Sequence, residues 1–225
     1  KALFASPLAW VVLTFLQVML AFGFLKRIDE FMQFQPQLVQ MPNPPGITEI
    51  VAAPVYSTVA IVFLFAIPLL AMRLIAEERR NQTLVLLLSA PISMTEIALG
   101  KFAGLVAFLW MLVGLATLMP LSLYLGGRLD LGLLASLVAG VALLAACFAA
   151  VALYASALTA QPFVASMIAF GLLLGMLLAG ETAADGLRNR GWSVPAELAQ
   201  VLSPLKNFES FAKGQLDSYN IICML

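Results

Sequence analysis

The distribution of charge is the feature of this sequence that most constrains its fold. All 12 Lys and Arg and all 12 Asp and Glu residues lie outside four long uncharged blocks, which cover residues 2–25, 50–72, 102–127 and 131–180. About 20 consecutive apolar residues cross a bilayer as a helix, so the first three blocks each fit one span and the fourth fits two. Since 62% of the residues are hydrophobic and 11% are charged, the chain is predicted to be an all-α integral membrane protein.

The breaks between the blocks predict where each span begins and ends. The fourth block divides at the polar, proline-bearing segment 159–162. Residues 26–49 are polar and proline-rich and are expected to be a connection that is not helical throughout. Pro68 is expected to kink the second span. The predicted spans of this single domain (residues 1–225) are about 7–25, 51–75, 102–125, 131–158 and 163–178. Residues from 221 are expected to begin a sixth span in a chain trimmed at both ends.

Several classes of function are disfavoured by residues that the chain lacks. It contains no histidine, so neither a histidine-based triad nor an H-E-x-x-H zinc site is possible. No carboxylate falls within the uncharged blocks, which argues against an intramembrane aspartyl protease and against charged ion pathways. Gly100-Lys101 lacks the surrounding residues of a phosphate-binding loop. We therefore predict no enzyme activity, no catalytic, cofactor-binding or metal-binding residues, and no nucleic-acid partner.

The charged connection between the second and third spans, residues 73–101, has an internal pattern. Four consecutive charged residues, Glu77 to Arg80, precede an apolar run, Leu84 to Leu88, that is too short to cross a membrane. Ser93 and Glu96 have the spacing of a capping box, which predicts a helix that begins near Met94 and continues into the third span. The charged cluster is either a solvated helix end or a contact for another protein. The apolar run is either an interfacial anchor or a docking helix.

The polar segment 181–220 is predicted to contain one short helix. Ser203 fits an N-cap, Pro204 the first helical position, and Gly214 the position just past the end. Helical spacing puts the apolar residues of this segment on one face. That face is predicted to hold Leu205, Phe208 and Phe211. Two arrangements fit: the helix lies on the membrane surface, or it forms a small cap on the spans.

Two glycines in the fifth span, Gly171 and Gly175, form a G-x-x-x-G pattern. Such a pair lets the backbones of two membrane helices approach closely. The pair could serve dimerisation between two copies of the chain or ordinary packing within one copy.

The order of these motifs resembles that of type-2 ATP-binding-cassette (ABC) permeases, and most closely their gliding-motility-associated branch. The matching region carries an acidic helix end at Glu77-Glu78, then Thr83, the leucine run, Pro91 and Gly100-Lys101. Further similar pieces are residues 130–132, 156–161 and 203–217. Two positions depart from the family pattern: Gln82 stands where glycine is usual, and Val85 where an acidic residue is common.

The resemblance implies a six-span permease with a cytoplasmic coupling helix in residues 76–101 and a short extracytoplasmic helical segment in residues 181–220. It implies a bacterial inner (plasma) membrane location, a cytoplasmic ABC ATPase dimer that binds ATP and Mg, and a second copy of the chain or a related permease. The implied coupling residues are Glu77, Glu78, Arg79, Arg80, Thr83, Leu86, Leu87, Pro91, Ser93, Glu96 and Lys101. The implied extracytoplasmic interface, open to a further partner protein, comprises Trp192, Leu205, Phe208 and Phe211.

The function expected from this resemblance is coupling of ATP hydrolysis by a separate ATPase to export or to extracytoplasmic conformational work. The alternative is a non-transporting membrane scaffold that recruits partners through residues 181–220. An independent channel or secondary transporter is disfavoured because the spans carry no charge.

Overall fold

The computed structural model describes residues 7–38, 46–82, 93–125, 129–178, 204–212 and 214, and these are almost entirely helical. The elements are α2 (Pro7–Leu38), the π-helical turn η1 (Thr48–Ala52), α3 (Ala53–Ala71), α4 (Ala76–Arg80), α6 (Met94–Ser122), the 3-10 turn η2 (Leu123–Leu125), α7 (Leu131–Leu158), α8 (Pro162–Leu178) and α11 (Pro204–Ala212).

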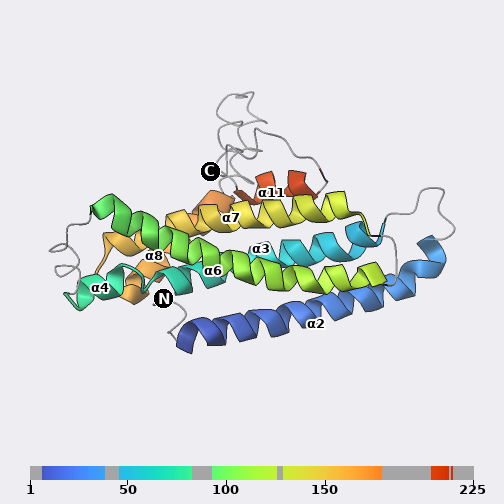
Figure 1. Cartoon of the computed structure of the whole chain (residues 1–225), viewed down its shortest axis with the longest axis horizontal. Helices are drawn as coiled ribbons and strands as arrows, with labels where there is room; N and C mark the ends of the chain where they lie inside the picture. The colour runs from blue at the N-terminus through green and yellow to red at the C-terminus, as the bar shows by residue number, and fades with distance from the viewer. Residues whose placement is uncertain are drawn as a thin grey trace, which may run out of the picture.

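The long helices run along one common axis (Figure 1). One end of the bundle carries α4, the start of α6 and the connection between α7 and α8, and we call it the α4 end. The opposite end, which we call the far end, carries η1, the end of α6 and the start of α7. Residues 73–82 and 159–162 therefore lie at the same end, as the predicted alternation of spans requires.

Four helical stretches of the described chain are long and apolar enough to cross a membrane: Trp10–Gln35, Thr48–Arg80, Met94–Ser122 and Leu131–Leu158. α8 corresponds to the predicted fifth span and has 17 residues, or about 26 Å at 1.5 Å per residue. That is somewhat shorter than the hydrocarbon core of about 30 Å. The fifth span therefore stays a prediction, and the predicted start of a sixth at residue 221 lies outside the described residues.

α3 lies at the centre of the bundle and α2 at its periphery. Within their apolar stretches, 61% of the α3 residues are buried but only 17% of those in α2. The fully buried Tyr56 of α3 donates a hydrogen bond of 2.8 Å to Thr117 Oγ1 on α6. α2 exposes large apolar side chains such as Phe15, Val18 and Phe22. Contact of such a surface with water is unfavourable in free energy, whereas contact with lipid tails is not.

Two helices end at other residues than the membrane spans predicted from the sequence. α2 does not end near residue 25 but continues to Leu38 through the charged residues. Side-chain pairs at helical spacing stabilise this extension: Arg27 with Glu30 at 2.8 Å, and Gln33 with Asp29 at 3.2 Å. α3 passes Pro68 without interruption and ends at Ala71 instead of residue 75.

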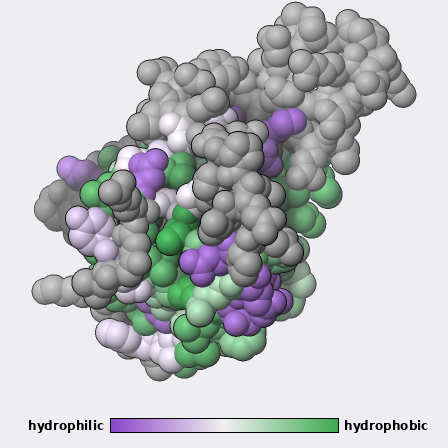
Figure 2. Space-filling view, turned by 90° about the vertical axis from the view of Figure 1, so that its right-hand side faces the viewer, coloured by the Kyte–Doolittle hydropathy of each residue, from purple (hydrophilic) through white to green (hydrophobic). Residues whose placement is uncertain are grey.

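At the far end, two loops are joined by hydrogen bonds. The buried Thr48 hydroxyl in η1 accepts from the backbone N–H of Asp130 at 2.9 Å. Asp130 caps α7, because its carboxylate accepts from the N–H groups of Gly132 and Leu133. Figure 2 views the molecule from this end, where hydrophilic residues lie among apolar ones.

The short helix α11 begins at Pro204 and is followed by Gly214, which has a φ of +73°, as the sequence predicts. Its apolar face packs against α7, where Phe208 and Phe211 are 2% and 0% exposed. Ser136 of α7 also donates a hydrogen bond of 2.8 Å to the carbonyl of Phe211. The arrangement is thus a helix packed on the bundle, and its buried phenylalanines contact this chain itself.

Candidate functional site

The candidate site is α4 and the chain segments that hold it at the α4 end. The sequence AEERR forms a short helix with its acidic residues in the first turn and its basic residues in the last. This order complements the helix dipole, which favours negative charge at the N-terminus and positive charge at the C-terminus. Ala76, the first residue of α4, is fully buried and anchors the helix to the bundle.

Ser156 fastens the turn before α4 to the end of α7. Its buried hydroxyl accepts from the N–H groups of Ile75 at 3.3 Å and Ala76 at 3.2 Å, and donates to the carbonyl of Met72 at 3.3 Å. The hydroxyl thus uses its donor and both acceptor positions on one turn. In addition, Arg79 of α4 donates to the carbonyl of Ala157 at 3.0 Å. These bonds connect α4 directly to α7.

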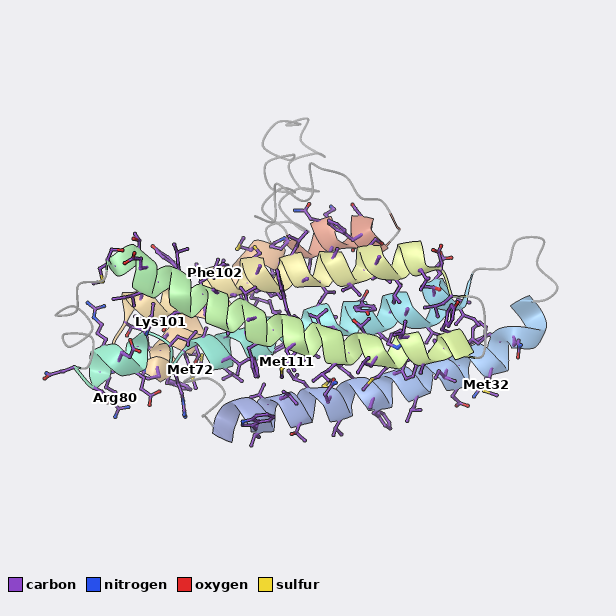
Figure 3. All side chains as sticks on the ribbon, in the orientation of Figure 1. Met32, Met72, Arg80, Lys101, Phe102 and Met111 are labelled. Atoms are coloured by element: carbon purple, nitrogen blue, oxygen red, sulfur yellow. The ribbon has the colours of Figure 1, made fainter. Side chains whose placement is uncertain are left out.

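Lys101 connects the same turn to α6. Its ammonium donates to the carbonyl of Leu74 and forms a salt bridge with the carboxylate of Glu78. The Lys101 side chain is 14% exposed and that of Glu78 is 31% exposed, so this pair is screened less than one on an open surface. In Figure 3 Lys101 lies beside α4 at the same end as Met72 and Arg80. A single ammonium therefore joins α6 to α4 and to the turn that precedes α4.

A groove of about 780 Å³ lies between α4 and the connection from α7 to α8. Its charged lining includes Arg73, Glu77 and Arg80, and Gln161 and Phe163 line the opposite side. Arg73 and Arg80 are exposed and form no ion pair with any residue that the structure describes. The groove therefore carries the positive charges of Arg73 and Arg80, which no described residue pairs, beside the carboxylate of Glu77.

The predicted capping box at the start of α6 is confirmed. The hydroxyl of Ser93 accepts from the N–H of Glu96 at 3.3 Å, and the Glu96 carboxylate accepts from the N–H of Ser93 at 2.8 Å. These hydrogen bonds, the one from the Ser93 backbone first, lower the pKa of Glu96. Because the ionised form is favoured in the folded chain, this contribution to the cap is present near neutral pH and is lost as the pH falls through the lowered pKa.

Gln82, which follows α4, occupies a backbone conformation that favours glycine. Its φ is +57°, the left-handed region, and it is the only such non-glycine residue among those described. A side chain in that region costs about 1 kcal/mol or more. The position where the family pattern has glycine thus keeps a glycine-like backbone in this chain.

We expect Gln82→Gly to stabilise the protein by about 0.5–1 kcal/mol, because glycine adopts this φ without steric cost. The neighbouring Asn81 has a φ of −84°, so Asn81→Gly gains nothing and adds flexibility to the unfolded chain. Thermal unfolding of the two purified variants measures the difference. A lower melting temperature for Gln82→Gly than for the wild type would contradict the assigned backbone conformation.

The other predicted site residues fall into two groups. Leu205 is half-buried and packs against the core from α11, beside the buried Phe208 and Phe211. An interface between α11 and a second protein would therefore have to use the opposite face of the helix. The residues outside the described part of the chain are Thr83, Leu86, Leu87, Pro91 and Trp192.

Gly171 and Gly175 lie on an exposed face of α8. A Cβ atom added at either position would meet no heavy atom within 4 Å among the described residues. The described residues therefore give no packing reason for the two glycines.

Backbone groups and one hydroxyl complete the site, and they are not among the residues predicted from the sequence. The carbonyls of Met72, Leu74 and Ala157 have no signature in the sequence, because every residue carries such a group. Ser156 did carry a signal, since a polar side chain near the end of a long apolar span commonly bonds to a neighbouring helix. Its partner could not be named without the fold.

Comparisons with known proteins agree with the helical architecture. A protein-family model described as ABC-2 family transporter protein matches residues 4–214. No curated protein and no solved structure matches the chain. The match covers nearly the whole sequence, including the four candidate spans, α4 and α11. The chain is therefore a multi-pass membrane protein of the ABC-2 transporter family, a permease family whose members are membrane subunits without a nucleotide-binding domain of their own.

Proposed function

We propose that this chain is the membrane subunit that couples ATP hydrolysis by a separate ABC ATPase to export or to conformational work on the other side of the membrane. The observation that carries the proposal is the set of bonds around α4. Lys101 joins α4 to α6, and Ser156 and Arg79 join the α4 region to α7. A displacement of α4 by a docked protein would thus reach both α6 and α7 at once.

Several features support docking at the α4 end. The groove there presents Arg73 and Arg80 without ionic partners among the described residues, and charged rims steer association with a complementary partner. The apolar run at residues 84–88 is proposed to enter a groove on the ATPase, as amphipathic helices do in other complexes. The α4 end would then face the cytoplasm of a bacterial cell, and ATP and Mg would be bound by the ATPase dimer.

The complex is proposed to contain a second copy of this chain or a related permease. The uncovered glycines of α8 support contact between two permease subunits. We also place the chain in the gliding-motility-associated branch, on the order of its motifs from Glu77 to Lys101 and from Ser203 to Asp217.

Co-purification of the full-length protein with its ATPase tests the proposal. Reversing both exposed arginines, Arg73→Glu and Arg80→Glu, should lower the recovered ATPase about tenfold, or about 1.4 kcal/mol of binding free energy. Leu86→Asp with Leu87→Asp should have a similar effect. Glu49→Lys, an exposed charge reversal at the far end, is the control and should leave recovery unchanged.

Two results would contradict the proposal. One is a full-length protein that purifies without any ATPase. The other is an associated ATPase activity that none of the variants at the α4 end alters. The first result would favour the scaffold alternative, in which residues 181–220 recruit the partners and deletion of residues 181–203 weakens that recruitment.

A further inference from the structure

The crevice between α2 and α3 carries two cavities, one after the other along the helices. The first, of about 450 Å³, is lined only by apolar side chains, among them Val11, Phe15 and Met19 of α2 and Ile61 and Phe65 of α3. The second, of about 120 Å³, lies nearer the far end. The crevice thus changes from purely apolar to polar along its length.

The smaller cavity is polar at one side because Lys26, Arg27 and Glu30 line it together with Thr58 of α3. Arg27 and Glu30 form a salt bridge with each other at 2.8 Å, so their charges cancel locally. Lys26 forms no salt bridge or hydrogen bond within the described part of the chain. Among the charged residues that line this cavity, Lys26 therefore carries a positive charge that no described residue pairs.

The spacing of the two cavities matches one leaflet of a bilayer. Met19 and Phe15 lie 7 and 11 residues before Lys26, or about 10 and 16 Å along α2. Half of a hydrocarbon core of about 30 Å is about 15 Å. Gly23 lies between these levels, and no described heavy atom comes within 4 Å of where its Cβ would be. A chain leaving the charged cavity therefore meets no side chain at Gly23 on its way to the apolar one.

We propose that this crevice binds an anionic phospholipid from the leaflet at the far end. The phosphate lies at Lys26, and one acyl chain lies in the apolar cavity between α2 and α3. A lysine ammonium is a compact phosphate-binding charge, and basic pockets between membrane helices bind anionic headgroups. An anionic phospholipid fits both features with one molecule, because its phosphate can lie at Lys26 while its acyl chain covers the apolar lining.

Native mass spectrometry of the full chain measures this binding. Phosphatidylglycerol and phosphatidylcholine with identical oleoyl chains are added separately to delipidated protein. We expect phosphatidylglycerol to bind at least about tenfold more tightly, and Lys26→Gln to remove that preference while some binding of both lipids remains. Lys206→Gln, which removes a cation on α11 outside the crevice, is the matched control and should retain the preference.

Filling the apolar cavity should weaken the binding of both lipids, regardless of their headgroups. Ile61→Trp does this from α3, and Val11→Trp does it from α2, each at an exposed lining residue. Equal affinity for the two lipids, or equal losses in Lys26→Gln and Lys206→Gln, would overturn the proposal. It would also be overturned if the tryptophan variants convert a dimer to a monomer without changing the number of bound lipids, because the cavity would then hold a second copy.

Discussion

Replacing Lys101 by methionine is expected to lower the stability of the protein by about 2 kcal/mol and to uncouple the ATPase. Methionine is about as long as the aliphatic part of lysine, but it lacks the ammonium that binds Glu78 and the Leu74 carbonyl. Both acceptors then lose a charged donor at a site where the Lys101 side chain is 14% exposed. At about 3 °C per kcal/mol for a chain of this size, the melting temperature should fall by about 6 °C.

The functional readout is the ATPase activity of the assembled complex. The response is the factor by which the permease changes the activity of the ATPase. We expect that response to fall about tenfold in Lys101→Met, because α4 would no longer be joined to α6. Glu49→Gln is the control, since Glu49 is exposed at the far end, away from the groove beside α4, and makes no ion pair with a described residue. It should reproduce the wild-type melting temperature and response.

Exchanging the two charges separates the salt bridge from the hydrogen bond to the backbone. In the double variant Glu78→Lys with Lys101→Glu, the ion pair can form again, but a carboxylate cannot donate to the Leu74 carbonyl. We therefore expect recovery of less than half of the lost stability. Full recovery would show that the bond to Leu74 is unimportant. An unaltered melting temperature and ATPase response in Lys101→Met would contradict the role of this residue as a connection.

Adding a single methyl group at Gly140 of α7 is expected to displace α11. A Cβ at this position would lie 2.8 Å from Cβ and 2.9 Å from Cγ of Phe211, and 3.1 Å from Cδ2 of Phe208. The Cβ of Phe211 is fixed to the backbone, so the clash can be relieved only by moving α11. Such overpacking costs about 1–3 kcal/mol, and Gly140→Leu should cost more because its side chain has no space.

Gly114→Ala is the control for this prediction. It makes the same change in α6, where no described atom lies within 4 Å of the added Cβ, and alanine has the higher helix propensity. The melting temperature should therefore fall in Gly140→Ala and stay level or rise in Gly114→Ala. Amide hydrogen exchange should accelerate in residues 204–212 of Gly140→Ala but not in α3. Equal melting temperatures for the two variants would contradict the close packing of α11 on α7.

The charged residues mark the limits of the apolar stretches but not the limits of the helices. The uncharged blocks predicted the apolar helices, because the cost of placing an ion in hydrocarbon acts on composition directly. The charges from Lys26 onward predicted the end of the first membrane span near residue 25, and the helix itself continues beyond that point. Charged residues end the part of a helix that lies in lipid, but side-chain pairs such as Arg27–Glu30 let the helix continue in water to Leu38.

Local signals also predicted helix ends well. The capping box at Ser93 and the Pro204 and Gly214 limits of α11 follow from bonds and backbone angles within a few residues, so the sequence contains all the information they need. The position of Gln82 was flagged only as a departure from the family pattern. The structure adds that its backbone retains the left-handed conformation.

The sequence by itself determined that this chain is a helical membrane protein, where most of its helices lie, and that its charges gather at their ends. These properties follow from transfer of residues between water and lipid and from short-range helix geometry. Only the tertiary structure decided that Lys101 and Ser156 hold α4, that Phe208 and Phe211 pack at Gly140, and that Lys26 faces a crevice beside α3. Those contacts join residues 20 to 80 positions apart, and their partners are set by how the helices pack.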